Sequence, residues 1–199
     1  MKKSVNIRYI TTTGILIAVA TILMYLEFSV PFVPSFLKFD FSDLPALIAS
    51  FAYGPIAGAV VCLAKNILHL PVTNTSGVGE LSNFILGCCY VIPAGIIYKK
   101  LKSKKAAFIG ALVGTFTMTV ISLFSNYYIV YPFYAKLGFT KEIVLSLYRV
   151  ILPSIENLWQ ALLIFNVPFT MIKGIIVTFI TMLIYKKLSP ILHGKKFDR

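Results

Sequence analysis

The sequence predicts an all-α integral membrane protein, a bundle of six transmembrane helices with both termini in the cytoplasm. The first observation behind this prediction is composition. Hydrophobic residues make up 58% of the 199 residues and the mean hydropathy is +0.84, whereas soluble domains are about 45–50% apolar. The second is that apolar segments recur to the end of the chain. We therefore expect one transmembrane domain over residues 1–199 and no cleavable signal peptide.

The third observation is the placement of the basic residues, which predicts the orientation. The net charge is +12, and most of the Lys and Arg residues fall into three clusters: Lys2, Lys3 and Arg8; Lys99, Lys100, Lys102, Lys104 and Lys105; and Lys186, Lys187, Lys195, Lys196 and Arg199. Loops that remain in the cytoplasm are enriched in Lys and Arg, and such clusters favour anionic lipid headgroups. We interpret the charge in this way, because no nucleic-acid-binding module is present.

The predicted spans cover residues 9–27, 44–53, 55–70, 78–98, 106–128 and 168–187. Their number depends on Gly54-Pro55, since a Gly-Pro pair is a strong turn signal. If residues 44–70 form one helix, there are five spans and the second basic cluster lies opposite the N-terminus. A turn at Gly54-Pro55 gives six spans and places all three clusters on one face, so we prefer it. Residues 44–53 then form only about 15 Å of helix, which must be short, tilted or partly buried in protein.

This topology makes the outer face distinctive. It carries the acidic residues Glu27, Asp40, Asp43, Glu80, Glu142 and Glu156. The outer connections are long, and the last of them, residues 129–167, is predicted to contain helices that lie on the bundle. Ser42 or Asp43 is expected to cap the helix that follows the first outer connection. Long outer connections over a thin inner face indicate capture of a molecule from outside.

Lys173 is the only charged residue inside the last apolar segment. A lysine at membrane depth costs a few kcal/mol, and Thr170, three residues earlier, shares its helix face. Pro168 favours the first position of a helix, so the last span is expected to begin there. A cation and a hydroxyl just inside the membrane predict a polar pocket. The alternative is a lysine that snorkels to the headgroups.

Further polar residues lie in the outer half of other spans. Asn126-Tyr127 ends the fifth span, and Glu80 and Asn83 begin the fourth. We expect them to converge with Lys173 into one site. The alternatives are that Asn126 bridges two helices and that Glu80 and Asn83 cap their helix. Lys65 of the third span is expected to snorkel.

Gly14 and Ala18 of the first span are four residues apart. Small residues at this spacing let another helix approach closely. The sequence therefore predicts a helix-docking face, with internal packing of the bundle as the alternative.

The sequence contains no motif of a known enzyme class. It has no P-loop, no H-E-x-x-H and no G-x-S-x-G. Cys62, Cys88 and Cys89 lack metal-binding spacing and are interpreted as core residues, and neither His69 nor His193 belongs to a metal constellation. We therefore predict no catalytic residue, metal or cofactor. Without an ATP site, the chain either carries a solute passively or takes energy from a partner.

Together these features resemble the riboflavin-specific substrate-binding subunit (S component) of energy-coupling factor (ECF) transporters. The resemblance covers nearly the whole chain and is carried by residues 37–46 (LKFDFSDLPA), 54–58 (GPIAG), 65–69 (KNILH), 77–84 (GVGELSNF), 126–127 with 132–134, and 168–174 (PFTMIKG). It implies a six-helix protein of the cell membrane with an outward-facing vitamin pocket. It also implies partners, namely a membrane coupling protein (T component) and two cytoplasmic ATPases that hydrolyse ATP.

The resemblance also implies site residues. Flavin contacts are expected from Leu37, Asn126 and Lys173, and docking on the coupling protein from Gly14 and Ala18. The family usually has Asn where this chain has Thr170, so one ring contact is lost or taken by Asn166 or water. The whole expected site is Leu37, Asp40, Glu80, Asn83, Asn126, Tyr127, Thr170 and Lys173.

The chemistry of riboflavin fits these residues. One edge of its flat isoalloxazine ring alternates acceptors with an N–H, which a carboxamide such as Asn126 matches with a donor and an acceptor. Lys173 can donate to a ring carbonyl or a ribityl hydroxyl. Aromatic residues expected to stack on or cover the ring are Phe36, Phe39, Phe41, Tyr127 and Tyr131. The alternatives are an S component for another vitamin, a small membrane enzyme, or a membrane scaffold without a ligand.

Overall fold

The computed structural model describes residues 7–73 and 75–193, with side chains described as far as Tyr185. Its helices are α1 (Ile7–Tyr25), α2 (Asp43–Tyr53), α3 (Pro55–His69), α4 (Val78–Leu101), α5 (Lys104–Ser125), α6 (Tyr131–Lys136), α7 (Lys141–Arg149), α8 (Leu158–Ala161) and α9 (Val167–His193). The remaining elements are a 3₁₀ turn (Leu70–Val72), two π-helical segments (Asn126–Val130 and Leu162–Asn166) and an antiparallel hairpin of β1 (Phe28–Ser29) with β2 (Lys38–Phe39). Outside the described residues lie Lys2, Lys3, Lys195, Lys196 and Arg199 of the predicted basic clusters.

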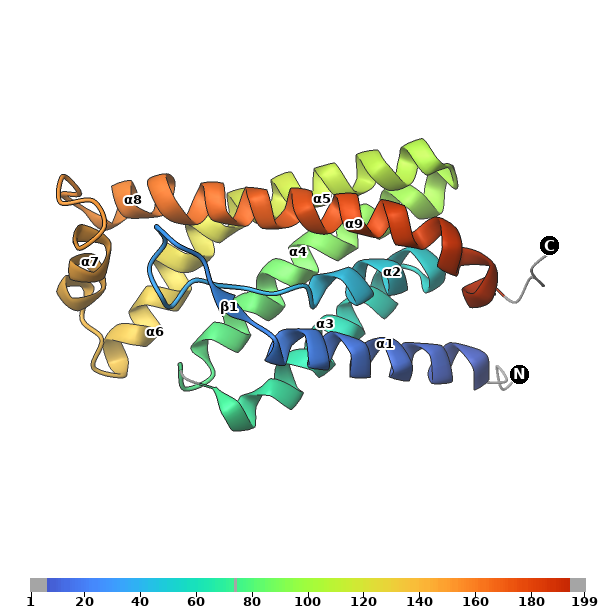
Figure 1. The fold of residues 1–199 in the computed structure, drawn as a ribbon, viewed down its shortest axis with the longest axis horizontal. Coiled ribbons are helices and arrows are strands. Elements are labelled where there is room, and N and C mark those ends of the chain that lie inside the picture. Colours follow the sequence, from blue (N-terminus) through green and yellow to red (C-terminus); the bar gives the residue numbers. More distant parts are fainter. Residues whose placement is uncertain (1–6, 74, 194–199) are drawn as a thin grey trace.

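The helices form an elongated bundle with two different ends. The start of α1, the turn between α4 and α5, and the far end of α9 lie at one end (Figure 1). The β-hairpin, α6 and α7 lie toward the other. The segments that carry the basic clusters therefore share one end of the bundle, and the long connections are at the opposite end.

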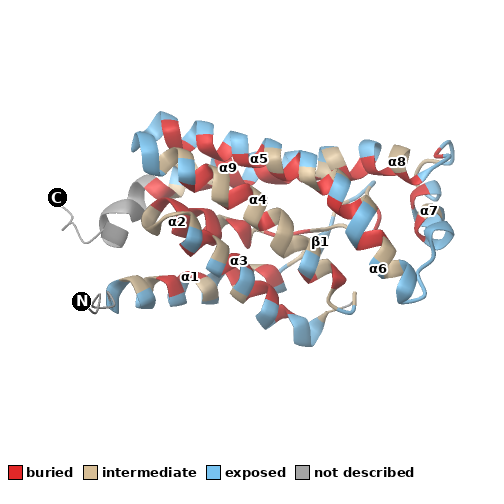
Figure 2. Ribbon diagram, turned by 180° about the vertical axis from the view of Figure 1, so that it is seen from behind, coloured by how far each residue is buried: buried red, intermediate tan, exposed pale blue. Residues whose placement is uncertain are grey.

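The outward surfaces of the bundle are apolar. Within the described residues, five stretches are long and apolar enough to cross a membrane: Ile7–Tyr25, Pro55–Val72, Val78–Leu101, Lys104–Lys136 and Leu158–Tyr185. Large hydrophobic side chains on them point away from the core, as at Ile15, Phe116 and Phe179, which are 58%, 68% and 62% exposed. Figure 2 shows such exposed positions along the outer faces of the helices. An apolar surface of this extent suits lipid and not water.

The predicted turn at Gly54-Pro55 is present and separates α2 from α3. Gly54 has φ +99°, a conformation that glycine adopts without a Cβ clash, and Pro55 begins α3. The short helix α2 is buried in protein: eight of its 11 residues are buried, and it packs against α1, α3, α4 and α9. This explains how so short a segment is accommodated in a membrane protein.

Two helices run further than the sequence predicted. The last helical run begins at Leu158 and not at Pro168, and the run that contains α5 continues to Lys136. A proline inside a helix cannot supply an N–H to the hydrogen-bond ladder. In both runs a π-helical segment ends two residues before the proline, with the Tyr131 N–H bonded to the Asn126 carbonyl and the Val167 N–H bonded to the Leu162 carbonyl. Neither register shift could be seen in the hydrophobic pattern.

The last outer connection contains helices, as predicted. Its helix α7 packs on the bundle through an apolar cluster of buried residues: Tyr131, Val144, Tyr148, Ile155, Leu158, Ala161, Leu162 and Phe165. This cluster lies at the end of the bundle opposite the start of α1 (Figure 1), and α7 is held there by burial of its own side chains.

Candidate functional site

A cavity of about 300 Å³ lies at the end of the bundle that carries the β-hairpin and the long connections (Figure 1). Its walls come from the first outer connection, the start of α4, the π-helical segment after α5 and the first half of α9. The side chains around it include Phe36, Leu37, Asp40, Asp43, His69, Glu80, Asn83, Asn126, Tyr131, Tyr134, Asn166, Phe169, Thr170 and Lys173. The volume is at the lower end of the range for small-molecule sites, about 300–1,000 Å³.

Seven of the eight residues expected in the site line this one cavity: Leu37, Asp40, Glu80, Asn83, Asn126, Thr170 and Lys173. Tyr127 does not. Its ring stacks on Trp159 with the centroids 4.4 Å apart, because the π-helical segment turns Tyr127 away and places Tyr131 against the cavity instead.

Two aromatic residues expected to cover the ring also lie elsewhere. Phe39 and Phe41 line a separate apolar groove of about 470 Å³ between the hairpin and α9. Phe169 borders both spaces and meets Phe39 edge to face, with centroids 6.1 Å apart. Of the expected aromatic residues, Phe36 and Tyr131 face the cavity.

Lys173 forms ion pairs with two carboxylates. Its Nζ lies 2.8 Å from Asp40 Oδ2 and 3.4 Å from Asp43 Oδ2, and the side chain is only 11% exposed. The ammonium is therefore held at the cavity wall and does not snorkel. An ammonium has three donors, so one remains for a ligand.

Lys65 was expected to snorkel, and this expectation is wrong. Its side chain is completely buried, and its Nζ lies 2.6 Å from Asp43 Oδ1. It also donates to the Ser42 hydroxyl, which in turn donates to Asp40 Oδ1. Lys65, Lys173, Asp40 and Asp43 thus form a buried network of two positive and two negative charges. A buried charge needs such compensation because its desolvation is costly.

The same network explains why the predicted cap of α2 is absent. Ser42 occupies the N-cap position, but its side chain makes no capping hydrogen bond, because the hydroxyl is used by Lys65 and Asp40. Burial raises the pKa of Asp40, but the ammonium groups of Lys173 and Lys65 outweigh this effect and hold the pKa well below its usual range. Asp40 is therefore an anion at neutral pH.

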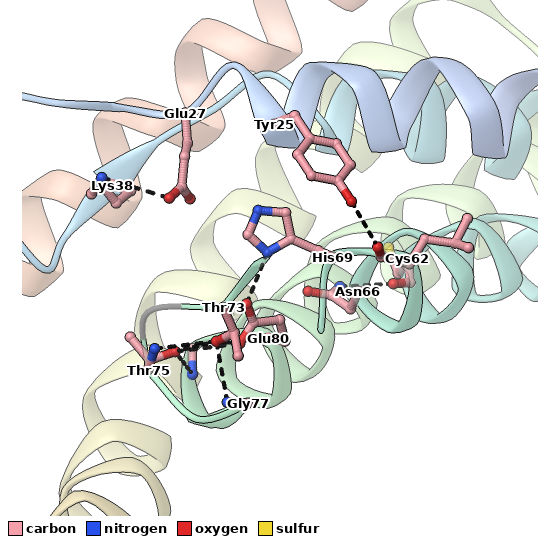
Figure 3. Close-up of polar contacts among 12 residues, drawn as sticks. Tyr25, Glu27, Lys38, Cys62, Asn66, His69, Thr73, Thr75, Gly77 and Glu80 are labelled. Carbon is pink, nitrogen blue, oxygen red and sulfur yellow. Dashed lines mark hydrogen bonds and ion pairs between the residues drawn. The ribbon is translucent and has the colours of Figure 1, made fainter. Parts of the chain in front are cut away.

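Glu80 organises the connection between α3 and α4 (Figure 3). Its Oε1 lies 2.8 Å from His69 Nδ1, and its Oε2 accepts hydrogen bonds from Thr73 at 2.8 Å and Thr75 at 3.3 Å. The ring of Tyr25 packs against the ring of His69 in a tilted arrangement, with the centroids 5.2 Å apart. The N-cap residue of α4 is Gly77, which has no side chain to cap the helix, and the Thr75 hydroxyl accepts a hydrogen bond from the Gly79 N–H at 3.0 Å instead. Glu80 thus joins His69, Thr73 and Thr75 at the start of α4.

Glu27 and Lys38 also line the cavity and form an ion pair, with their charged atoms 3.6 Å apart (Figure 3). This pair links the end of α1 to β2. Among the described residues, no group of three His, Cys, Asp or Glu side chains is placed to hold a metal ion.

Two buried carboxamides face the cavity. Asn126 begins the first π-helical segment and Asn166 ends the second, directly before α9, and they are 7% and 2% exposed. Within the described chain, the side chain of Asn126 makes no hydrogen bond. The Asn166 Oδ1 accepts a hydrogen bond from Tyr148, and the Tyr131 hydroxyl lies near the same amide. Buried polar groups normally have partners, so these amides are available to a ligand or to water.

Asp43 and His69 were not predicted to belong to the site, and Asn166 was predicted only as an alternative to water. Asn166 lies seven residues before Lys173 and four before Thr170, which is a helical spacing, but the predicted start of the helix at Pro168 excluded it from that face. Asp43 had been interpreted as a helix cap, and His69 has no local signal. Their positions depend on contacts between different helices.

The proposed docking residues lie on the outside of α1. Gly14 and Ala18 are both exposed, and a Cβ added at Gly14 would meet nothing within 4 Å. The face that these two residues share is therefore open within the described structure, which argues against internal packing.

The chain is similar to known membrane transport proteins over most of its length. The model of the ECF transporter substrate-specific component matches residues 8–185. A Staphylococcus aureus protein named riboflavin transporter RibU is 33% identical over 181 residues, covering 91% of this chain and 90% of that protein. A Bacillus subtilis protein named riboflavin transporter FmnP is 34% identical over 188 residues, covering 93% and 94% of the two chains. A solved S component of a bacterial ECF transporter superposes with a TM-score of 0.74 at 32% identity, covering 92% of this chain and 96% of that one.

Proposed function

Because the chain belongs to the family of ECF transporter substrate-specific components, we propose that it captures riboflavin from outside the cell. It is a multi-pass protein of the cell membrane, and its relatives are named riboflavin transporters. The observation that carries the proposal is the cavity between the first connection and α9, where two buried amides and a buried ammonium have donors that can reach a ligand. Riboflavin is the transported ligand and not a cofactor. The hydrolysis of ATP is assigned to two cytoplasmic ATPases that a membrane coupling protein connects to this subunit.

The cavity walls match the two parts of riboflavin. The flat ring requires apolar walls, which Phe36, Leu37 and Phe169 provide, and hydrogen-bonding groups at one edge. Asn126 offers a donor and an acceptor to that edge, and Lys173 offers its third donor. Polar side chains at the rim suit the hydroxyl-bearing ribityl chain.

The proposal is tested by ligand content. Protein purified from medium with riboflavin should be yellow and should release a fluorescent flavin when it is denatured. After the ligand is removed, added riboflavin should lose its fluorescence on binding, at one molecule per chain, and an excess of thiamine or biotin should not displace it. A colourless protein that leaves riboflavin fluorescence unchanged but binds another vitamin would instead be an S component of different specificity.

We further propose that the six helical segments α1, α2, α3, α4, α5 and α9 traverse the membrane region with both termini in the cytoplasm. The segments that carry the basic clusters lie at the same end of the bundle (Figure 1), which supports this orientation. A cysteine at position 102 (Lys102→Cys) should be labelled only after cells are permeabilised, and one at position 76 (Ser76→Cys) should be labelled in intact cells. Labelling of position 102 from outside would contradict the proposed orientation.

Helix α1 is proposed to dock on the coupling protein through Gly14 and Ala18. Gly14→Leu or Ala18→Leu should leave riboflavin binding to the isolated subunit unchanged, because neither residue lines the cavity. Uptake by the complete transporter should fall, because a leucine keeps a partner helix at a distance. Val19→Leu, on another exposed part of α1, is the control and should retain uptake. Loss of binding in a folded Gly14 or Ala18 variant would show that this face packs inside the bundle.

A further inference from the structure

A chain of buried hydrogen bonds connects the outer helix α7 to the cavity wall. The Tyr148 hydroxyl donates to Asn166 Oδ1 at 2.6 Å, and the hydroxyl oxygens of Tyr131 and Tyr148 are also 2.6 Å apart. Tyr148, Asn166 and Tyr131 are 0%, 2% and 3% exposed, so bulk water does not compete for these bonds. Tyr131 and Asn166 line the cavity, whereas Tyr148 lies behind them.

The direction of this chain follows from the number of protons. Each hydroxyl has one proton to donate, and that of Tyr148 is committed to Asn166 Oδ1, so Tyr131 must donate to Tyr148. Burial raises the pKa of Tyr148, which keeps its proton in place at neutral pH. The Asn166 carboxamide is therefore held by its oxygen. Its Nδ2 group makes no hydrogen bond of good distance and angle within the described part of the chain, and the Tyr131 hydroxyl lies near the same amide.

The position of Asn166 on its helix places this amide among other donors. Asn166, Thr170 and Lys173 follow the spacing i, i+4 and i+7, which puts them on one face over about 10 Å. All three line the cavity. Their amide, hydroxyl and ammonium groups can all donate along this wall, so it favours a ligand edge that presents acceptors. The carbonyl and ring-nitrogen acceptors of an isoalloxazine meet this requirement.

We propose that Asn166 contacts the ligand through its Nδ2 group and that Tyr148 is a positioning residue, which fixes the orientation of this amide. The inference rests on the proposed function, because it takes riboflavin as the ligand. It makes α7 part of the binding unit, although no side chain of α7 lines the cavity.

Riboflavin titration of purified, ligand-free variants tests this inference. Asn166→Ala should weaken binding about tenfold or more, because a buried acceptor of the ligand loses its donor. Asn166→Asp keeps an oxygen for Tyr148 but presents no donor to the cavity, so it should weaken binding at least as much while it preserves the anchor to α7. Tyr148→Phe keeps the ring that packs against Phe36 and Phe165 and should weaken binding about two- to tenfold.

A double variant separates positioning from general damage. If Tyr148 acts through Asn166, then Tyr148→Phe should cause no further loss of affinity once Asn166 is alanine. The matched control is Tyr128→Phe, because Tyr128 is 64% exposed and does not line the cavity. If the losses of riboflavin affinity from the two single variants add up in the double variant, Tyr148 does not act through Asn166. If both Asn166 variants bind riboflavin as tightly as the wild type, Asn166 does not contact the ligand. A wild-type protein that binds no riboflavin would overturn the proposed function and this inference together.

Discussion

Replacing Lys65 by methionine is expected to destabilise the fold by about 3–5 kcal/mol, the cost of removing one partner from a buried ion pair. Methionine keeps the apolar stem but removes the charge that lies 2.6 Å from Asp43 Oδ1. Asp40 and Asp43 would then share the single cation of Lys173. The loss should appear as a lower midpoint of unfolding, by heat or denaturant, of ligand-free protein in detergent.

Two further variants make this prediction specific. Lys100→Met removes an exposed lysine and should change stability by no more than about 0.5 kcal/mol. Adding Asp43→Asn to the Lys65 variant should recover part of the loss, because one cation and one anion then remain, with Lys173 Nζ 2.8 Å from Asp40 Oδ2. If Lys65→Met were as stable as the wild type, the charge network would contribute nothing to the fold.

Replacing Lys173 by methionine is expected to weaken riboflavin binding about tenfold to hundredfold. The ligand would lose a charged donor in a buried site, which costs about 1–3 kcal/mol or more, and 1.4 kcal/mol corresponds to a factor of ten. The same change removes the partner of Asp40, so stability should also fall. Fluorescence or calorimetric titration measures the first effect, and unfolding of the ligand-free protein measures the second.

An arginine at the same position separates these two roles. Lys173→Arg keeps a cation for Asp40 and Asp43 but directs its donors differently from an ammonium. We therefore expect it to retain most of the stability while binding remains weakened. If a folded Lys173→Met protein bound riboflavin as tightly as the wild type, Lys173 would belong to the structural network alone.

The sequence alone was sufficient for the class of protein and for most of the helices. Hydropathy and turn signals depend on residues that are close together in the chain, so Gly54-Pro55 could be recognised as a break without knowledge of packing. The cost of polar groups inside apolar segments is also local. For this reason Lys173, Thr170 and Asn126 could be selected as site candidates, and they do line one cavity.

The tertiary structure decided which partners these groups have. Lys65 and Asp43 are 22 residues apart in the chain, and Lys173 and Asp40 are 133 residues apart. No local pattern predicts such pairs, so a buried ion-pair partner such as Lys65 was mistaken for a snorkelling residue. The π-helical segments had a similar effect. By shifting the helix register, they turned Tyr127 toward Trp159 and let the last helical run continue from Leu158 past Pro168. Apolar and polar positions along a chain show where a site can form, but side chains that meet across helices determine its charge balance and its donors.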